Sequence, residues 1–541
     1  MKRLYKKSVL ILCSLSFAGF AFAQNIELPE VTTVISGDTE KVEADALPDF
    51  SDVLTTKPVS VGSGGVEPVL PEVETTENTE IATGKTFVTD KSVYAEGLLG
   101  GGYPTLFKGD IAVFRNVGES PFRFALYHDS SIGYAGHAFN DGFSDRLTKI
   151  EIEKSYKKNN ITWSAGGSYQ TAADGLQGNV TDCFGYDPAS LYNRDTYNVA
   201  GKIGYEFSNG FYTGFDAGLD FYNRYADRKS ASIPTIAYMD IEPSTYFRWK
   251  GHGFDTGITA EYSFDTEFAN ESFCVGHRAE FTADLQWQND FLKIYGNASA
   301  VVGNHLKGIP VIVPFTVGFD TSFPVYFANR RVGIGLEGGI KSYKPHIWEL
   351  ENKYKFSEIS CNSLESSDWY GKFNLTLPLK SAFTGNAAIE YYQTAYNNGV
   401  FEADYSNERA SLYSIYQKDH QLLITDFSLA YTYEIFSISG GWHSNWMDVP
   451  ALESKQAVRL ALNIQDEQAR WGSTIGFLML INSEIENPVL NAEGFVRLTP
   501  SVRAILSVND LIKLYKGETR VYAGKFASRG GSASVLLKFF F

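Results

Sequence analysis

Residues 199–222 read VAGKIGYEFSNGFYTGFDAGLDFY and contain two runs in which apolar and polar positions alternate. In the first run Val199 and Ile203 fall on one face, whereas Lys202 falls on the other. The chain turns near Gly210, and the second run then repeats the alternation. Period-two alternation on both sides of a glycine-containing turn predicts an antiparallel hairpin with one apolar and one polar face.

Strand length separates a membrane barrel from a soluble sandwich, because both have one apolar face. The alternating runs extend over about ten residues or more, as a tilted strand needs to cross a bilayer, whereas soluble strands centre on about five or six. Aromatic residues such as Tyr197, Phe207 and Trp369 lie near the ends of these runs, as in the interfacial girdles of outer-membrane barrels. The sequence therefore predicts an all-β fold, a closed antiparallel transmembrane barrel of about 22 strands (range about 18–24) over residues 91–541.

The chain ends in SASVLLKFFF, residues 532–541. Val535, Leu537, Phe539 and Phe541 share one face of the predicted last strand, which we expect to contact lipid. This strand must pair with the first strand, since an open sheet edge in hydrocarbon leaves backbone groups without partners. The terminal phenylalanine also resembles the C-terminal signal that the barrel-assembly machinery reads in bacterial outer-membrane proteins. A soluble sandwich that ends in an apolar strand is the alternative.

The N-terminal region predicts export. Residues 1–23 combine four positive charges, an apolar stretch and Ala21-Phe22-Ala23, which is typical of a signal peptide cleaved after Ala23. No later apolar run approaches the roughly 18 residues of a transmembrane helix. Residues 24–90 carry 14 acidic and 3 basic residues with few aromatics, so we expect a disordered periplasmic tail. A formal charge of −16 excludes an electrostatic basis for nucleic-acid binding.

The sequence predicts no catalytic, cofactor or metal site. The eight histidines show no pair at metal-ligand spacing. His443 and Ser444 are neighbours in a predicted strand, so their side chains point to opposite faces and do not share a proton. The mature chain keeps three widely spaced cysteines, for which isolated thiols are the preferred interpretation over a single disulfide. They are Cys183, Cys274 and Cys361.

Three segments carry a family resemblance. Asn509-Asp510-Leu511 stands at the end of a predicted strand over Val502–Leu511, an outer loop comes next, and Arg529-Gly530-Gly531-Ser532 leads into the last strand. Residues 95–115, with Gly-Gly-Gly-Tyr before a turn, resemble the opening of the barrel. Together these segments resemble TonB-dependent outer-membrane receptors. The resemblance implies outer-membrane localisation and a role in solute uptake.

The N-terminal tail departs from that family. Its receptors place a plug of well over a hundred residues before the barrel, whereas the tail spans residues 24–90 only. We therefore expect a barrel without a plug domain. Residues 26–37, IELPEVTTVISG, resemble the box that contacts a TonB-like inner-membrane energiser, and a solvated spacer is the alternative. The resemblance makes a seven-residue segment the candidate docking strand: Leu28, Pro29, Glu30, Val31, Thr32, Thr33 and Val34.

Three functions remain open from the sequence. The first is a transport barrel related to TonB-dependent receptors, and the second is a passive porin-like channel. The third is a structural or surface-recognition barrel whose tail recruits a periplasmic protein. We expect the lumen to be occluded by loops, tail or partner, because an open pore of about 22 strands would leak.

Overall fold

The computed structural model describes residues 93–541, apart from several loop positions and short loop segments. These gaps are 116–119, 135–136, 138–140, 178–189, 228–234, 269–272, 305, 307, 326–329, 360–363, 381, 406–411, 451, 483–485, 519 and 523–525. The predicted signal peptide, acidic tail and docking segment, as well as Cys183 and Cys361, lie outside the described residues.

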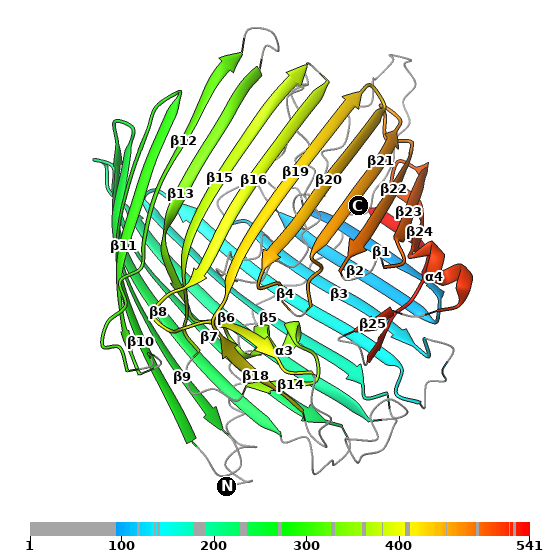
Figure 1. Ribbon diagram of the computed structural model, residues 1–541, viewed down its shortest axis with the longest axis horizontal. Coiled ribbons are helices and arrows are strands. Elements are labelled where there is room, and N and C mark those ends of the chain that lie inside the picture. The colour runs from blue at the N-terminus through cyan, green and yellow to red at the C-terminus, as the bar shows by residue number, and fades with distance from the viewer. Residues whose placement is uncertain are drawn as a thin grey trace, which may run out of the picture. The chain divides into compact units, whose positions relative to one another are not determined.

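The described chain forms one closed sheet of 22 strands, which confirms the predicted fold class and strand number (Figure 1). Every strand pairs antiparallel with its neighbours in chain order. The strands are β1 Tyr94–Tyr103, β2 Leu106–Arg115, β3 Phe122–Ile132, β4 Ser144–Lys158, β5 Ile161–Gly175, β6 Leu191–Glu206, β7 Phe211–Ala226, β8 Ile236–Gly251, β9 Phe254–Phe268, β10 Phe273–Gln288, β11 Leu292–Gly303, β12 Phe315–Val325, β13 Arg330–Tyr343, β15 Ser366–Lys380, β16 Phe383–Thr394, β19 Gln421–Tyr433, β20 Phe436–Met447, β21 Gln456–Gln465, β22 Trp471–Ile481, β23 Val489–Thr499, β24 Val502–Asn509 and β27 Ser532–Phe540.

Shorter elements lie in three of the loops. They are α3 Ile347–Lys353 and β14 Ser357–Ile359 between β13 and β15, β17 Val400–Ala403 and β18 Tyr413–Lys418 between β16 and β19, and α4 Leu511–Lys516, β25 Arg520–Tyr522 and β26 Phe526–Ser528 between β24 and β27. Among the described residues, no helix is long and apolar enough to cross a bilayer.

The first and last strands close the barrel, as the sequence predicts. β1 pairs with β27 over eight positions, and Leu99 lies opposite Leu537. Gly100 and Gly102 lie at this seam, where a Cβ atom would overlap with the carbonyl oxygens of Val535 and Ala533. The glycines of the Gly-Gly-Gly-Tyr stretch therefore allow the two edges to approach closely.

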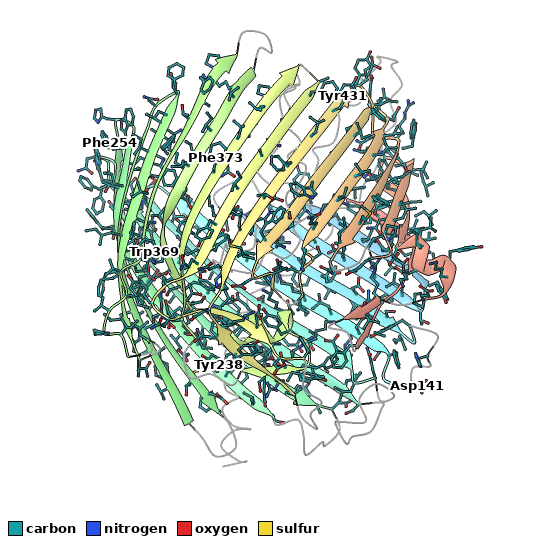
Figure 2. All side chains as sticks on the ribbon, in the orientation of Figure 1. Asp141, Tyr238, Phe254, Trp369, Phe373 and Tyr431 are labelled. Carbon is teal, nitrogen blue, oxygen red and sulfur yellow. The ribbon has the colours of Figure 1, made fainter. Side chains whose placement is uncertain are left out.

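The outer face of the barrel is apolar and the inner face is polar. Val199, Ile203 and Phe215 of the hairpin quoted above are exposed on the outer face, as the alternation predicts. Figure 2 shows aromatic side chains near both strand ends, including Phe254 where β9 begins and Trp369 near the start of β15. A polar inner face and an outer face with aromatic ends are the surfaces of a transmembrane barrel.

The C-terminal residues occupy the outer face of the last strand. Val535 and Leu537 are exposed there, and Phe539 stacks on Phe541 with ring centroids 6.3 Å apart. On the inner face, Lys538 lies 3.3 Å from Glu96 of β1. The lipid-facing register that the sequence predicts for this strand is thus the one that the structure shows.

The two ends of the barrel differ in loop length. At the short-turn end, loops such as 159–160 and 500–501 are brief, and Phe541 lies beside the start of β1 through hydrogen bonds with Ala95 of 2.7 and 3.1 Å. At the long-loop end, the connections after β13, β16 and β24 span 344–365, 395–420 and 510–531. Short turns at one end and long loops at the other are typical of outer-membrane barrels.

One predicted element requires correction. The strand expected over Val502–Leu511 ends at Asn509, because Asp510 has a φ of 48° and caps the short helix α4. The Asp510 carboxylate accepts hydrogen bonds from the backbone N–H of Lys513 and from Arg520 Nε, the latter at 2.6 Å. Gly531 lies against this helix, where a Cβ atom would overlap with Leu514. The predicted outer loop thus folds into a helix packed on the last strand.

Candidate functional site: a loop cap on the inner wall

Two long loops fold together at the long-loop end of the barrel. We call the described residues of loops 344–365 and 395–420 the cap. Within it, β14 pairs parallel with β18, and β18 pairs antiparallel with β17, which gives a three-stranded sheet beside α3 (Figure 1). The helix begins after Pro345-His346, where Glu349 accepts a hydrogen bond from the His346 N–H, a capping pattern.

The cap and the barrel wall share one buried hydrophobic cluster. Tyr192, Tyr222 and Tyr238 extend into it from the inner faces of β6, β7 and β8. Figure 2 shows Tyr238 beside the cap. The cap contributes Ile347, Leu350, Tyr354, Phe356, Leu364, Phe401, Ala403, Tyr405, Leu412, Tyr413 and Ile415. At the long-loop end, the inner faces of β6, β7 and β8 therefore pack against the cap and do not face an open lumen.

A buried ion pair joins β7 to the cap helix. Arg224 is fully buried and pairs with Glu351 of α3, which also accepts a 2.6 Å hydrogen bond from the Tyr222 hydroxyl. Arg194 of β6 donates to the Glu351 carbonyl oxygen at 2.9 Å. Desolvating two charges is costly, and the pair is tolerated because both partners have several hydrogen bonds.

Further ion pairs continue this joint around the wall. Lys355 lies 2.6 Å from Asp174 of β5, and Arg278 of β10 lies 3.0 Å from Glu365. Lys344 lies 3.0 Å from Asp240 of β8. In each pair one partner is a cap residue and the other belongs to the inner register of a strand. The cap is thus attached along the wall from β5 to β10.

Loops from the C-terminal part of the chain also contact the cap. Phe526 of β26 lies over Phe356, with ring centroids 4.4 Å apart, and it belongs to the same buried cluster. Leu452, in the loop between β20 and β21, packs against that cluster. The cap therefore connects the wall of β5–β10 with loops that follow β20 and β24.

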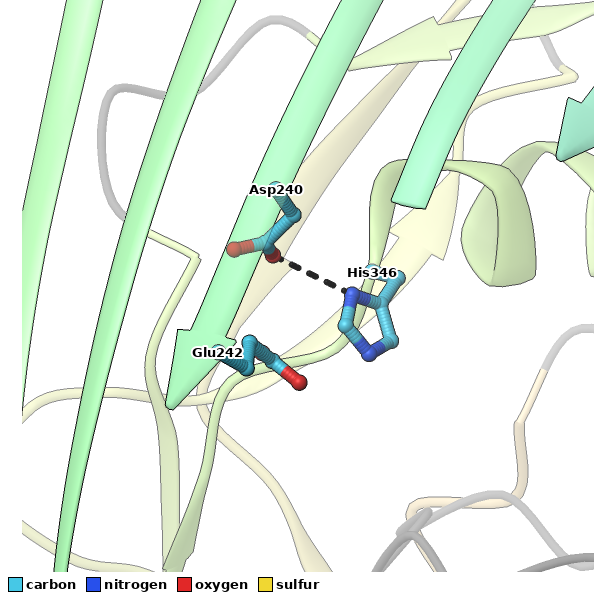
Figure 3. A group of neighbouring side chains, drawn as sticks. All are labelled: Asp240, Glu242 and His346. Atoms are coloured by element: carbon cyan, nitrogen blue, oxygen red, sulfur yellow. Dashed lines mark ion pairs between the residues drawn. The ribbon is translucent and has the colours of Figure 1, made fainter. Parts of the chain in front are cut away.

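One group of side chains at the joint has the composition of a metal site. Asp240 and Glu242 lie two residues apart in β8 and so point inward together. His346 precedes α3, and one ligand atom from each of the three lies within 4.8 Å of the others (Figure 3). His346 Nδ1 is 3.3 Å from Asp240 Oδ2, and its ring stacks on Trp348 at 4.2 Å.

The cap groups have shifted pKa values. Burial lowers the pKa of His346, but the hydrogen bond to Asp240 and the charges of Glu242 and Glu349 raise it more, and the net shift is upward. Burial likewise opposes the charge of Lys344, yet Asp240 and Asp265 raise its pKa. On the other side of the cap, burial raises the pKa of Glu453 to about 7. The charges at the two sides of the cap therefore respond differently to pH.

A polar cavity of about 950 Å³ lies at the short-turn end, between the turns that follow β8 and β10 and the facing strands β12, β13 and β15. His252, Asp255, Asp290, Arg331 and Asn374 are among its lining residues. Charged side chains and an amide therefore line this cavity.

The structure separates some residues that the sequence places side by side. His443 and Ser444 lie in β20 and have different partners: His443 Nδ1 lies 2.7 Å from Asp426, and Ser444 donates to the Lys455 carbonyl oxygen at 3.2 Å. Trp446, near the end of β20, is exposed on the outer face. Cys274 lies in β10. The cap and the His346 group are absent from the sequence interpretation.

Two features of the sequence could have indicated the cap. Loops 344–365 and 395–420 are, with 510–531, the longest connections between barrel strands, and Pro345 followed by Glu349 at the third helical position is a helix-start pattern. The metal-type group gives no such indication, since Asp240 and His346 are remote in the chain and only the barrel brings them together.

Comparison with known proteins gives fold relatives only. No family model matches the chain, and no curated protein matches it either. Among solved structures, the copper transporter OprC superimposes with a TM-score of 0.61 at 9% identity, over 83% of each chain. The FrpB iron transporter from Neisseria meningitidis (F3-3 variant) gives 0.63 at 7% identity, over 84% of this chain and 82% of its own.

A third solved structure, the siderophore receptor PirA from Pseudomonas aeruginosa, gives a TM-score of 0.61 at 9% identity. It covers 84% of this chain and 81% of its own length. At such identities the likeness concerns the fold. The described part of the chain thus has the large closed barrel that these transporters and this receptor share.

Proposed function

We propose that the protein is an outer-membrane barrel that takes up a solute and is kept closed by its own cap. One observation carries this proposal: the cap is held on the inner wall by buried ion pairs, of which Arg224 with Glu351 is the most enclosed. A buried charge pair is strongly destabilised when one partner is removed. The cap is therefore a specific closure that opens as a unit.

The fold relatives support a transport role. They include a copper transporter, an iron transporter and a siderophore receptor. The signal peptide predicted over residues 1–23 and the lipid-type outer face support an outer-membrane location, with the short-turn end in the periplasm. The polar cavity at that end would then receive solute that has passed the cap.

The proposal includes a barrel without a separate plug domain. In this proposal the cap has the closing role that a plug has in the TonB-dependent receptors that the sequence resembles. Residues Leu28–Val34 are the proposed docking strand for a TonB-like or other periplasmic protein, and Val535, Leu537, Phe539 and Phe541 are the proposed signal to the barrel-assembly machinery. No catalysis is proposed for the protein.

Planar-bilayer conductance of the purified full chain tests the closure. The wild type should conduct little, and a variant in which short linkers replace residues 346–364 and 396–419 should show stable, large conductance. A stable large conductance from the wild type would instead support a passive porin-like channel.

Measuring solute uptake by whole cells distinguishes a transport barrel from a structural or surface-recognition barrel. If deleting residues 24–90 leaves conductance low but abolishes uptake, the tail acts as the proposed energiser contact. A structural or surface-recognition barrel predicts that neither deletion changes the uptake of any solute, and that result would contradict the proposal.

A further inference from the structure

We propose that Asp240, Glu242 and His346 bind a divalent transition-metal ion, which ties the cap to the barrel wall. Two of these residues belong to the wall strand β8, and His346 belongs to the cap. An ion held by all three would therefore cross-link the two parts. This inference concerns binding at the joint and does not depend on whether the barrel transports a solute.

The spacing of the donor atoms suits one ion. In a tetrahedral site with ligands about 2.0–2.1 Å from the metal, two donor atoms lie about 3.3 Å apart. His346 Nδ1 and Asp240 Oδ2 are separated by 3.3 Å. All three donors lie within 4.8 Å of one another, so a small movement of the flexible Glu242 side chain brings its carboxylate to the same ion.

Glu242 has no other partner in the described part of the chain. No hydrogen bond or ion pair involves its side chain there, and Figure 3 shows a carboxylate oxygen directed towards the His346 ring. The His346 ring is held in place by the stacked Trp348 ring, and the His346 backbone N–H donates a hydrogen bond to Glu349. The group thus combines a fixed imidazole, a buried carboxylate and a carboxylate that is free to move.

Lys344 is the competing cation at this site. Its ammonium nitrogen lies 3.0 Å from Asp240 Oδ2 and 2.9 Å from Asp265 Oδ1. A metal ion at Asp240 Oδ2 would repel the Lys344 ammonium group and displace it from that oxygen. Lys344 would then keep Asp265 as its partner. Lys344 therefore sets the metal concentration at which the cross-link forms.

The donor set selects the class of ion. One imidazole nitrogen with two carboxylates suits zinc, copper, iron(II) or manganese, whereas calcium and magnesium prefer oxygen ligands only. Zinc is the appropriate probe, because it imposes no geometry through its d-electrons and does not change oxidation state.

The test measures zinc binding to the chelator-stripped full chain in detergent, by calorimetry and by metal analysis after dialysis. The wild type should bind one zinc ion at this site and bind calcium far more weakly. His346→Ala and Glu242→Gln should each weaken zinc binding by more than about tenfold, since even losing an outer-shell partner costs about 10–100-fold. His420→Ala is the matched control, because His420 lies near Asp368 at the same end of the barrel.

Lys344→Gln gives the opposite sign. Removing the competing ammonium should tighten zinc binding, a result that a merely structural Lys344 would not produce. Zinc should also slow proteolysis of the cap in the wild type but not in Glu242→Gln. Unchanged zinc affinity in Glu242→Gln, or weaker binding in Lys344→Gln, would overturn the proposal. Because Glu242 has no structural partner among the described residues, that variant remains informative if His346→Ala does not fold.

Discussion

The wall from β4 to β10 and the wall from β22 through the seam to β2 are built differently. The seven strands of the first region have 15 or 16 residues each, whereas those of the second have 8 to 11. Crossing a bilayer takes about 9–11 residues, so only the first region extends well beyond the lipid. The parts of these strands that extend beyond the bilayer therefore carry the residues to which the cap is attached.

The outer face of β6 shows where lipid contact ends. Val199, Ile203 and Tyr205 are exposed and apolar, whereas Asn193 and Asp195, in the same register nearer the long-loop end, are polar. The inner register at that level contains Arg194, which contacts the cap. The seam region has no such extension, since β24 ends at Asn509 and Asp510 caps α4, which follows directly.

Arg224→Ala should have the largest effect. It leaves Glu351 buried without its charged partner, which costs about 3–5 kcal/mol. We expect rapid proteolysis of the cap and increased conductance. The matched control is Lys202→Ala, which breaks an exposed inner-wall pair with Asp216 and should cost at most about 1 kcal/mol. Equal effects in urea unfolding would contradict the importance of the cap joint.

A charge on the outer face tests the boundary of the bilayer. Leu506→Arg places a cation near the middle of β24 and should cost about 2–4 kcal/mol, because that position faces lipid. Asn223→Arg, in the outer register of the extended part of β7, should cost about 0–1 kcal/mol. Refolding titrations into lipid vesicles measure both, and a large cost at Asn223 would show that the extension lies within the membrane.

Glu453 makes the far side of the cap sensitive to pH. Its pKa of about 7 in the folded protein exceeds its ordinary value of 4.5, so the folded state holds more protons between these pH values. The free energy of unfolding should therefore fall as pH rises from about 5 to 7, by up to about 3 kcal/mol. Glu453→Gln should flatten this dependence in urea unfolding followed by tryptophan fluorescence. An unchanged slope would exclude Glu453 as its source.

A substitution at the seam between β1 and β27 should have the smallest effect on stability. Gly102→Ala introduces a Cβ atom that overlaps with Ala533, and overpacking of this kind costs about 1–3 kcal/mol. Gly218→Ala in β7 is the control, since its Cβ atom would meet no described heavy atom within 4 Å. Heat-induced mobility shifts on electrophoresis measure both, and a seam that tolerates alanine as well as β7 does would contradict the close approach.

The barrel was predictable because the alternation of apolar and polar residues within each strand is local in the sequence. The alternation from Val199 to Phe221 fixes which side faces lipid, and the apolar register of residues 532–541 indicates the closing strand. The contacts that attach the cap were not predictable, because they join residues far apart in the chain, such as Arg224 and Glu351. His346 shows the same limit: its partners in β8 precede it by about a hundred residues and become neighbours only after closure.

The pairing of β1 with β27 has a consequence for biosynthesis. Among the strands that the structure describes, β27 supplies the edge on which β1 completes its hydrogen bonds. A product shortened by a premature stop codon would keep two unpaired edges that hydrocarbon does not tolerate. Closure of the barrel therefore couples residues 96–103 to residues 533–540, so a chain that lacks β27 is expected to insert poorly into a bilayer.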